Sequence, residues 1–182
     1  TVIPSLAQVY SVNVVGYVNA DVPAGFSLVA NPLDATSNNV QDLMPAVNMT
    51  VYKFTDGSYE IATYIAAASL WTGPNFEINP SEGVWINNAG DPFTITFVGE
   101  ITEGTKDNAI PAGFSIRSSI IPQSGTMTAL GWPAEVGDAV YEWDNAGNTY
   151  ATANFVGVWA PAEPTIEVGQ AFFASSPQAF FA

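Results

Sequence analysis

The chain has 182 residues, with 17 acidic side chains against 3 basic ones and a formal net charge of −14. Phosphate backbones and anionic lipid surfaces attract clustered Lys and Arg, so this charge argues against nucleic acid as a partner and against membrane attachment. Cys and His are both absent, which excludes thiol chemistry, Cys/His zinc sites and any nucleophile activated by His. No apolar run reaches the roughly 18 residues needed to span a bilayer, so membrane insertion is not expected.

Hydrophobic residues make up 48% of the chain, enough for a sizeable core, whereas charged residues are only 11%. The surface must therefore consist largely of neutral polar and apolar groups. Such a surface favours a chain that packs against copies of itself or against other partners.

The N-terminal residues Thr1–Gln8 resemble the start of a mature chain from which a signal peptide has been removed. They predict a secreted, extracellular protein with an N-terminal arm at residues 1–8. Next, residues 9–18 alternate in polarity, with Val12, Val14 and Val18 on one face, and predict a strand. Residues 19–25 contain Pro and Gly and predict a turn, and residues 26–31 predict the second strand.

Further along, Asn38 and Asn39 predict the cap of a short helix that runs to Met44. The Asp56-Gly57 pair predicts a tight turn between two strands. Residues 66–71 fit either a loop or one helical turn. Three more short strands are expected at residues 76–78, 83–87 and 93–99. They are followed by a polar connector at residues 100–109.

The sequence Pro-Ala-Gly-Phe-Ser occurs twice, beginning at Pro23 and at Pro111, with a spacing of 88 residues (111 − 23 = 88). The same spacing relates Pro45 to Pro133, Trp71 to Trp159 and Ile78 to Ile166. Several anchors at one offset indicate an internal duplication. We therefore predict an all-β protein with little helix, built from two tandem sandwich- or barrel-like lobes at residues 9–102 and 103–182.

The two copies differ in their last strand. The first copy runs through Phe93–Gly99, whereas the second reaches Phe180-Phe181-Ala182 and lacks most of the equivalent strand. The N-terminal segment resembles that strand, so it could close the second copy of its own molecule or of a neighbour. The residues predicted to make these assembly contacts are Val2, Ile3, Leu6, Val9, Val12 and Val14 in the inserted segment, and Phe172, Phe173, Phe180 and Phe181 in the receiving region.

Three stretches, VNVVGYVNADVPAGFSLVANPL, VYKFTDGSYE and PSEGVWINNAGDPFTITFVGEI, resemble a group of secreted bacterial β-repeat proteins that are mostly uncharacterised. The likeness covers nearly the whole chain, in two copies. It implies export and a two-copy β-fold, and it implies no catalytic residues, because the shared positions are turn residues and strand aromatics.

Several residue groups could carry chemistry, and each has a simpler explanation. The pairs Glu77/Glu82 and Glu163/Glu167 could act as paired carboxylates, but scattered surface charge is favoured among 17 acids. Asp144–Asn148 is oxygen-rich but lacks the spacing of a calcium loop. Five Trp side chains could stack on sugars, yet aromatics repeated at matched positions favour core packing; they are Trp71, Trp85, Trp132, Trp143 and Trp159.

These observations favour a secreted structural subunit that assembles with copies of itself into a filament or surface layer. The alternative is an extracellular carbohydrate-binding or adhesive module, which requires at least two exposed Trp or Tyr on one concave face. We expect no enzymatic activity, no cofactor and no metal site.

Overall fold

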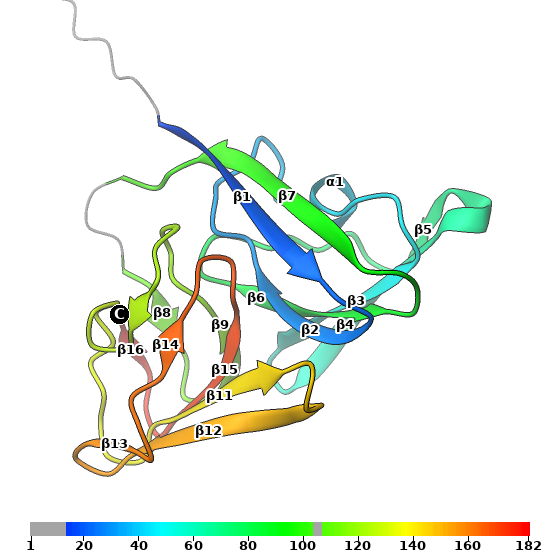
Figure 1. Ribbon diagram of the computed structural model, residues 1–182. Helices are drawn as coiled ribbons and strands as arrows, with labels where there is room; N and C mark the ends of the chain where they lie inside the picture. Colours follow the sequence, from blue (N-terminus) through cyan, green and yellow to red (C-terminus); the bar gives the residue numbers. More distant parts are fainter. Residues whose placement is uncertain (1–13, 104–106) are drawn as a thin grey trace, which may run out of the picture.

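The computed structural model describes residues 14–103 and 107–182, which form an all-β molecule with little helix and two similar halves. This confirms the predicted fold class and the predicted duplication. We call residues 14–103 the first lobe and residues 107–182 the second lobe (Figure 1).

The first lobe contains a two-stranded sheet and a five-stranded sheet, both antiparallel. Its five-stranded sheet has the order β2-β6-β3-β4-β5. A four-residue helix and a short 3₁₀ turn are its helical elements. The elements are β1 (Val15–Val22), β2 (Gly25–Ala30), α1 (Val40–Leu43), β3 (Met49–Thr55), β4 (Ser58–Ile65), η1 (Ala66–Ala68), β5 (Leu70–Thr72), β6 (Gly83–Asn88) and β7 (Phe93–Glu100).

Strand β1 pairs with β7 of its own lobe, from Val15 opposite Glu100 to Val22 opposite Phe93. The predicted turn at residues 19–25 is therefore wrong over most of its length, because alternation of exposed and inward residues continues to the buried Val22. The chain turns at Pro23–Ala24, and Gly25 begins β2 with a φ of +94°, a value that favours Gly. Residues 76–78 were predicted to form a strand, but they form no regular strand. They contribute one isolated β-bridge, between Glu77 and Asn39.

The second lobe repeats the order of the five-stranded sheet as β9-β15-β11-β12-β13. Its glycine equivalent to Gly25, Gly113, also has a positive φ, +84°, at the start of β9. The elements are β8 (Ala109–Ile110), β9 (Gly113–Arg117), β10 (Gly125–Thr126), β11 (Ala139–Asp144), β12 (Thr149–Phe155), β13 (Trp159–Ala160), β14 (Thr165–Ile166), β15 (Phe172–Ser176) and β16 (Phe180–Phe181).

Two of the differences between the lobes bear on the candidate sites. The pair β8–β16 corresponds to β1–β7 but joins two residues on each strand where β1–β7 joins eight. The hairpin between β3 and β4 turns through two residues, Asp56 and Gly57, whereas the equivalent hairpin between β11 and β12 turns through four, residues 145–148.

Each five-stranded sheet has one face toward its own lobe and one toward the other lobe. In the first lobe the inner face supplies Val29, Val51 and Ile86, which pack with Ile95 and Phe97 of β7. The second lobe has its own core around Val140, Phe172 and Ile166. A third cluster contains residues of both lobes and forms the lobe junction: Leu28, Ala30, Trp85, Ile116, Ala171 and Phe173.

The lobe junction has approximate twofold symmetry, because its contacts occur in equivalent pairs. The Ala30 amide donates to the Gly169 carbonyl at 2.9 Å, and the equivalent Ser118 amide donates to the Ser81 carbonyl at 3.0 Å. Gly83 and its equivalent Ala171 face each other at the centre, where a Cβ on Gly83 would lie 2.3 Å from that of Ala171. Reciprocal contacts of this kind are typical of an isologous interface.

Candidate functional site

Ten aromatic rings, five from each lobe, form a network across the junction in symmetric pairs. Phe54 and Tyr59 have ring centroids 5.1 Å apart, and their equivalents Trp143 and Tyr150 are also 5.1 Å apart. The contact between Phe54 and Phe173, at 5.6 Å, corresponds to that between Trp143 and Trp85, at 5.0 Å. The remaining rings are Phe26, Tyr52, Phe114 and Tyr141. Most of these contacts are edge-to-face, and such packing stabilises the junction beyond the burial of the ring area.

On one side of this network the rings line an open aromatic groove of about 410 Å³. Tyr59 and Tyr150, from the two lobes, are exposed to 44% and 40%. The five other side chains that line the groove are Phe26, Tyr52, Ile61, Trp85 and Trp143. Exposed rings on a concave face make this groove a candidate binding surface.

Two tyrosine hydroxyls supply polar groups to this apolar groove. Burial raises the pKa of Tyr59, and a hydrogen bond from the Trp85 indole partly opposes that shift. Burial also raises the pKa of Tyr150, with a smaller contribution from Tyr59. Both hydroxyls therefore stay protonated at neutral pH and can both donate and accept hydrogen bonds.

Beside the aromatic groove the β11–β12 hairpin closes the junction. The Trp143 indole donates to the Phe26 carbonyl at 2.7 Å, and the Asn145 amide donates to the same carbonyl at 2.5 Å. The oxygen-rich loop that could have bound calcium is thus a hairpin turn, with Asn145 directed toward the other lobe.

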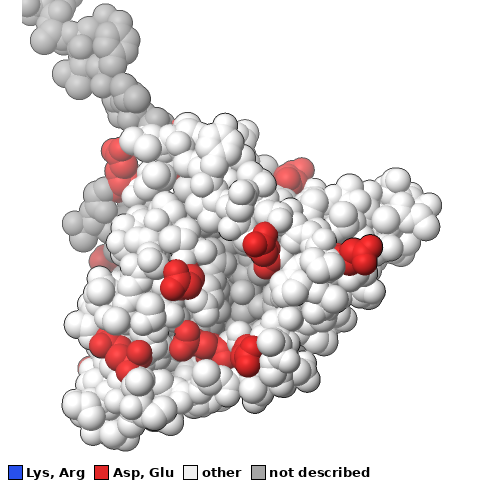
Figure 2. All heavy atoms as spheres, in the orientation of Figure 1, with Lys and Arg blue, Asp and Glu red and all other residues white. Residues whose placement is uncertain are grey.

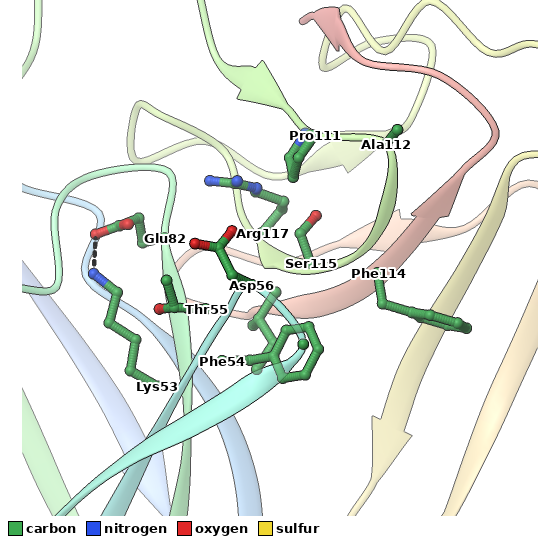
Figure 3. A pocket seen from close by; sticks show the side chains of 13 residues that line it. Lys53, Phe54, Thr55, Asp56, Glu82, Pro111, Ala112, Phe114, Ser115 and Arg117 are labelled. Atoms are coloured by element: carbon green, nitrogen blue, oxygen red, sulfur yellow. Dashed lines mark hydrogen bonds and ion pairs between the residues drawn. The ribbon is translucent and has the colours of Figure 1, made fainter.

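The equivalent position on the opposite side is open, and it holds a cleft of about 470 Å³ between β9 and the β3–β4 hairpin (Figure 3). Lys53 and Glu82 form an ion pair at 2.9 Å on the first-lobe side of this cleft. Arg117 reaches into the same space, beside Asp56 and Pro111 (Figure 3). Lys53 and Arg117 are two of the three basic residues of the chain.

A third hollow, of about 220 Å³, lies in the second lobe beside Ala182. Its walls are mainly apolar and include Met127, Leu130, Trp132 and Phe172. Ala182 and Asn108 exchange backbone hydrogen bonds of 2.9 and 2.7 Å at one end. In the first lobe the residues that follow the equivalent position belong to β7, where Phe97 is buried in the core.

Of the predicted assembly residues, Val2, Ile3, Leu6, Val9 and Val12 lie outside the described residues. Val14 is exposed immediately before β1. Phe172 lies in the core of the second lobe, Phe173 at the lobe junction, and Phe180 against the Trp132 ring. Phe181 is 69% exposed. The structure thus brings Phe172 and Phe180 together beside Trp132 and places Phe173 elsewhere.

The acidic pairs do not form a shared pocket in the described part of the chain. Glu82 forms an ion pair with Lys53, and the pKa of the half-buried Glu163 is lowered by hydrogen bonds from Thr128. Residues 14–103 and 107–182 contain no cluster of three His, Cys, Asp or Glu that could hold a metal, and no helix long and apolar enough to span a membrane. On the face shown in Figure 2 acidic side chains are scattered, and no Lys or Arg is visible.

The aromatic groove could not be located from the sequence, although its residues could be listed. Trp85 is buried in the lobe junction, as predicted, and Trp143 is half-buried beside it, whereas Tyr59 and Tyr150 gave no signal of their own. The matched aromatic positions of the two copies were the available clue, because equivalent residues converge where a twofold axis relates the copies. Comparison of the chain with protein-family models, with curated proteins and with solved structures finds no match.

Proposed function

We propose that this protein is an extracellular binding module that holds a neutral carbohydrate chain in the aromatic groove. The observation that carries the proposal is the pair of exposed tyrosines, Tyr59 and Tyr150, on one concave face with Trp85 and Trp143. This meets the condition that the sequence set for a carbohydrate-binding module.

The chemistry of the groove fits a sugar chain. Sugar rings present apolar C–H faces that pack on aromatic rings, and their hydroxyl groups pair with the Tyr59 and Tyr150 hydroxyls. The net charge of −14 repels polyanionic glycans, so it favours a neutral chain. A groove that is open at the surface suits a chain that continues beyond the site.

The test is binding of three neutral hexasaccharides, cellohexaose, mannohexaose and maltohexaose, measured by calorimetry and by Trp fluorescence. We expect at least one to bind and to change the emission of Trp85 and Trp143. Tyr59→Ala and Tyr150→Ala should each weaken that binding about tenfold. Tyr17→Ala is the matched control, because Tyr17 is 75% exposed on β1 and does not line the groove. Absence of binding to all three sugars, or equal loss in Tyr17→Ala, would contradict the proposal.

A second candidate function is a structural subunit that assembles with copies of itself by strand complementation. The observation in its favour is the mainly apolar hollow in the second lobe, where the β8–β16 pair is much shorter than its equivalent β1–β7. A strand from a neighbouring copy that carries a large apolar side chain would cover Met127 and Leu130 and pair beside β8 and β16.

Electron microscopy of the purified protein tests this second candidate. We expect polymers that disappear when residues 1–8 are deleted. A peptide that copies residues 94–100 of β7 should compete for the hollow and shorten the polymers, whereas the same peptide with Phe97 replaced by Asp should not. Monomers under all conditions, or polymers that persist after the deletion, would contradict it.

A further inference from the structure

The cleft at the open side of the lobe junction exists because the symmetry of the junction is broken there. On the closed side, Trp143 and Asn145 donate to the Phe26 carbonyl. On the open side, the equivalent of Trp143 is Phe54, which has no ring N–H. The two-residue turn at Asp56–Gly57 is also shorter than its counterpart, and no described side chain donates to the Phe114 carbonyl, the equivalent of that of Phe26.

Strand β9 is the outer strand of its sheet; Arg117 at its end is bridged to Glu82 of the first lobe, and the edge before that bridge faces this cleft. The Ser118 amide points away from the sheet, since it donates to Ser81 of the other lobe. Backbone groups alternate in direction along an antiparallel strand, so the N–H and C=O groups of Phe114 also point outward. Phe114 therefore offers the cleft one donor and one acceptor on an unpaired strand edge.

Arg117 provides the charge at the end of this edge. Its guanidinium makes no hydrogen bond or ion pair with any described residue, and its Nε is buried without a partner. Burial lowers the pKa of Arg117, and the nearby Glu82 partly offsets this. Glu82 itself is engaged by Lys53 and by the Asn79 amide. The equivalent position in the first lobe is Val29, so this charge has no counterpart on the closed side.

We propose that the open cleft binds an extended peptide segment that pairs with β9 and places a Glu carboxylate on the Arg117 guanidinium. On the closed side, two side-chain N–H groups donate to the Phe26 carbonyl. The equivalent carbonyl on the open side, that of Phe114, should therefore also accept an N–H donor. A peptide supplies such a donor from its backbone. On the added strand, the residue opposite Ser115 is a diagonal neighbour of Arg117. A Glu side chain at that position can reach the Arg117 guanidinium. This proposal is independent of carbohydrate binding in the aromatic groove.

The test uses three fluorescently labelled peptides with the sequence Thr-Val-X-Val-Thr, where X is Glu, Gln or Lys, and measures fluorescence anisotropy with the full chain. We expect the Glu peptide to bind at least tenfold more tightly than the Gln peptide, and the Lys peptide to bind least. Arg117→Met should abolish the preference for Glu and leave the fold intact, because Met has a similar length and needs no partner. A Glu preference that survives Arg117→Met would overturn the proposal, as would equal binding of the Glu and Gln peptides.

A second variant tests backbone pairing with β9. Phe54→Trp, combined with replacement of Asp56–Gly57 by the sequence of residues 145–148, should copy the closed side and reduce binding of the Glu peptide at least tenfold. The matched variant Trp143→Phe with Asn145→Ala opens the other side, where Val29 replaces the arginine, and should create no Glu-dependent binding. N-methylation of the peptide amide that faces Phe114 should also weaken binding tenfold. Unchanged binding after both the loop replacement and the N-methylation would overturn the proposal.

Discussion

The two sides of the lobe junction have the same arrangement of strands, but different residues fill them. On one side the β11–β12 hairpin reaches the other lobe through Trp143 and Asn145, and the junction is closed. On the other side Phe54 and a two-residue turn stop short of β9, and a cleft with Arg117 remains. Two additional turn residues and one indole N–H are enough to separate a structural contact from a candidate binding site.

The aromatic groove and the cleft both lie where equivalent parts of the two lobes approach each other. Duplication brings two copies of each strand to one junction, and later differences between the copies decide which parts are filled. Substitutions at equivalent positions of the two lobes can therefore be compared, and their different effects show what each side of the junction contributes.

The largest effect is expected at the centre of the junction. Gly83→Ala places a methyl group 2.3 Å from the Ala171 Cβ and 2.7 Å from Ile116 Cγ2, where no space remains. Overpacking of this kind should lower the free energy of unfolding by about 3 kcal/mol, measured by urea denaturation. The double variant Gly83→Ala with Ala171→Gly moves the methyl group across the axis and should recover most of the loss. Equal stability of the single and double variants would contradict a symmetric junction.

A smaller pair of effects is expected at two equivalent residues with positive φ, Ser81 at 83° and Gly169 at 78°. Both carbonyls accept a hydrogen bond from the opposite lobe. Gly169→Ala forces a side chain into this conformation and should cost about 1–2 kcal/mol. Ser81→Gly removes the backbone strain and should raise the free energy of unfolding by up to about 1 kcal/mol. The larger backbone entropy of Gly in the unfolded chain reduces this gain. Thermal unfolding of both variants checks the opposite signs.

The hydrogen bond that closes one side can be removed alone. Trp143→Phe keeps a ring against Trp85 and loses the indole N–H that donates to Phe26. We expect a loss of about 1 kcal/mol in urea denaturation, the usual net contribution of one hydrogen bond. Phe114→Leu on the open side is the control, because no described side chain makes the equivalent hydrogen bond there. Its change in stability should be accounted for by the lost ring contact with Tyr141.

The smallest effect concerns alkaline pH. Tyr59 and Tyr150 have pKa values raised above 10.0 in the folded protein, mainly by burial. As pH rises above 10.0 these tyrosines ionise first in the unfolded chain, so the free energy of unfolding falls. The double variant Tyr59→Phe with Tyr150→Phe should show a shallower fall between pH 9 and pH 11. An unchanged slope would contradict the raised pKa values.

The sequence predicted the architecture well, because duplication and strand alternation are both properties of residue order. The repeated Pro-Ala-Gly-Phe-Ser sequence located equivalent strands, and alternation correctly placed Ile95 and Phe97 inside. The extent of β1 was missed, since Asn19 and Asp21 resemble turn residues, yet they lie on the exposed face of a strand. The groove and the cleft were not predicted, because they depend on how far the sheets separate beside the axis and on which carbonyl a hairpin reaches.

The contact between Gly83 and Ala171 has a consequence for how molecules recognise one another. Two first lobes from different molecules would meet with Gly against Gly and leave a gap the size of a methyl group. Two second lobes would meet with Ala against Ala and force two methyl groups into space for one. The unlike pair fits better than either like pair, so each lobe disfavours a lobe of its own kind. A duplicated chain with two similar halves is thereby biased against pairing like lobes of different molecules.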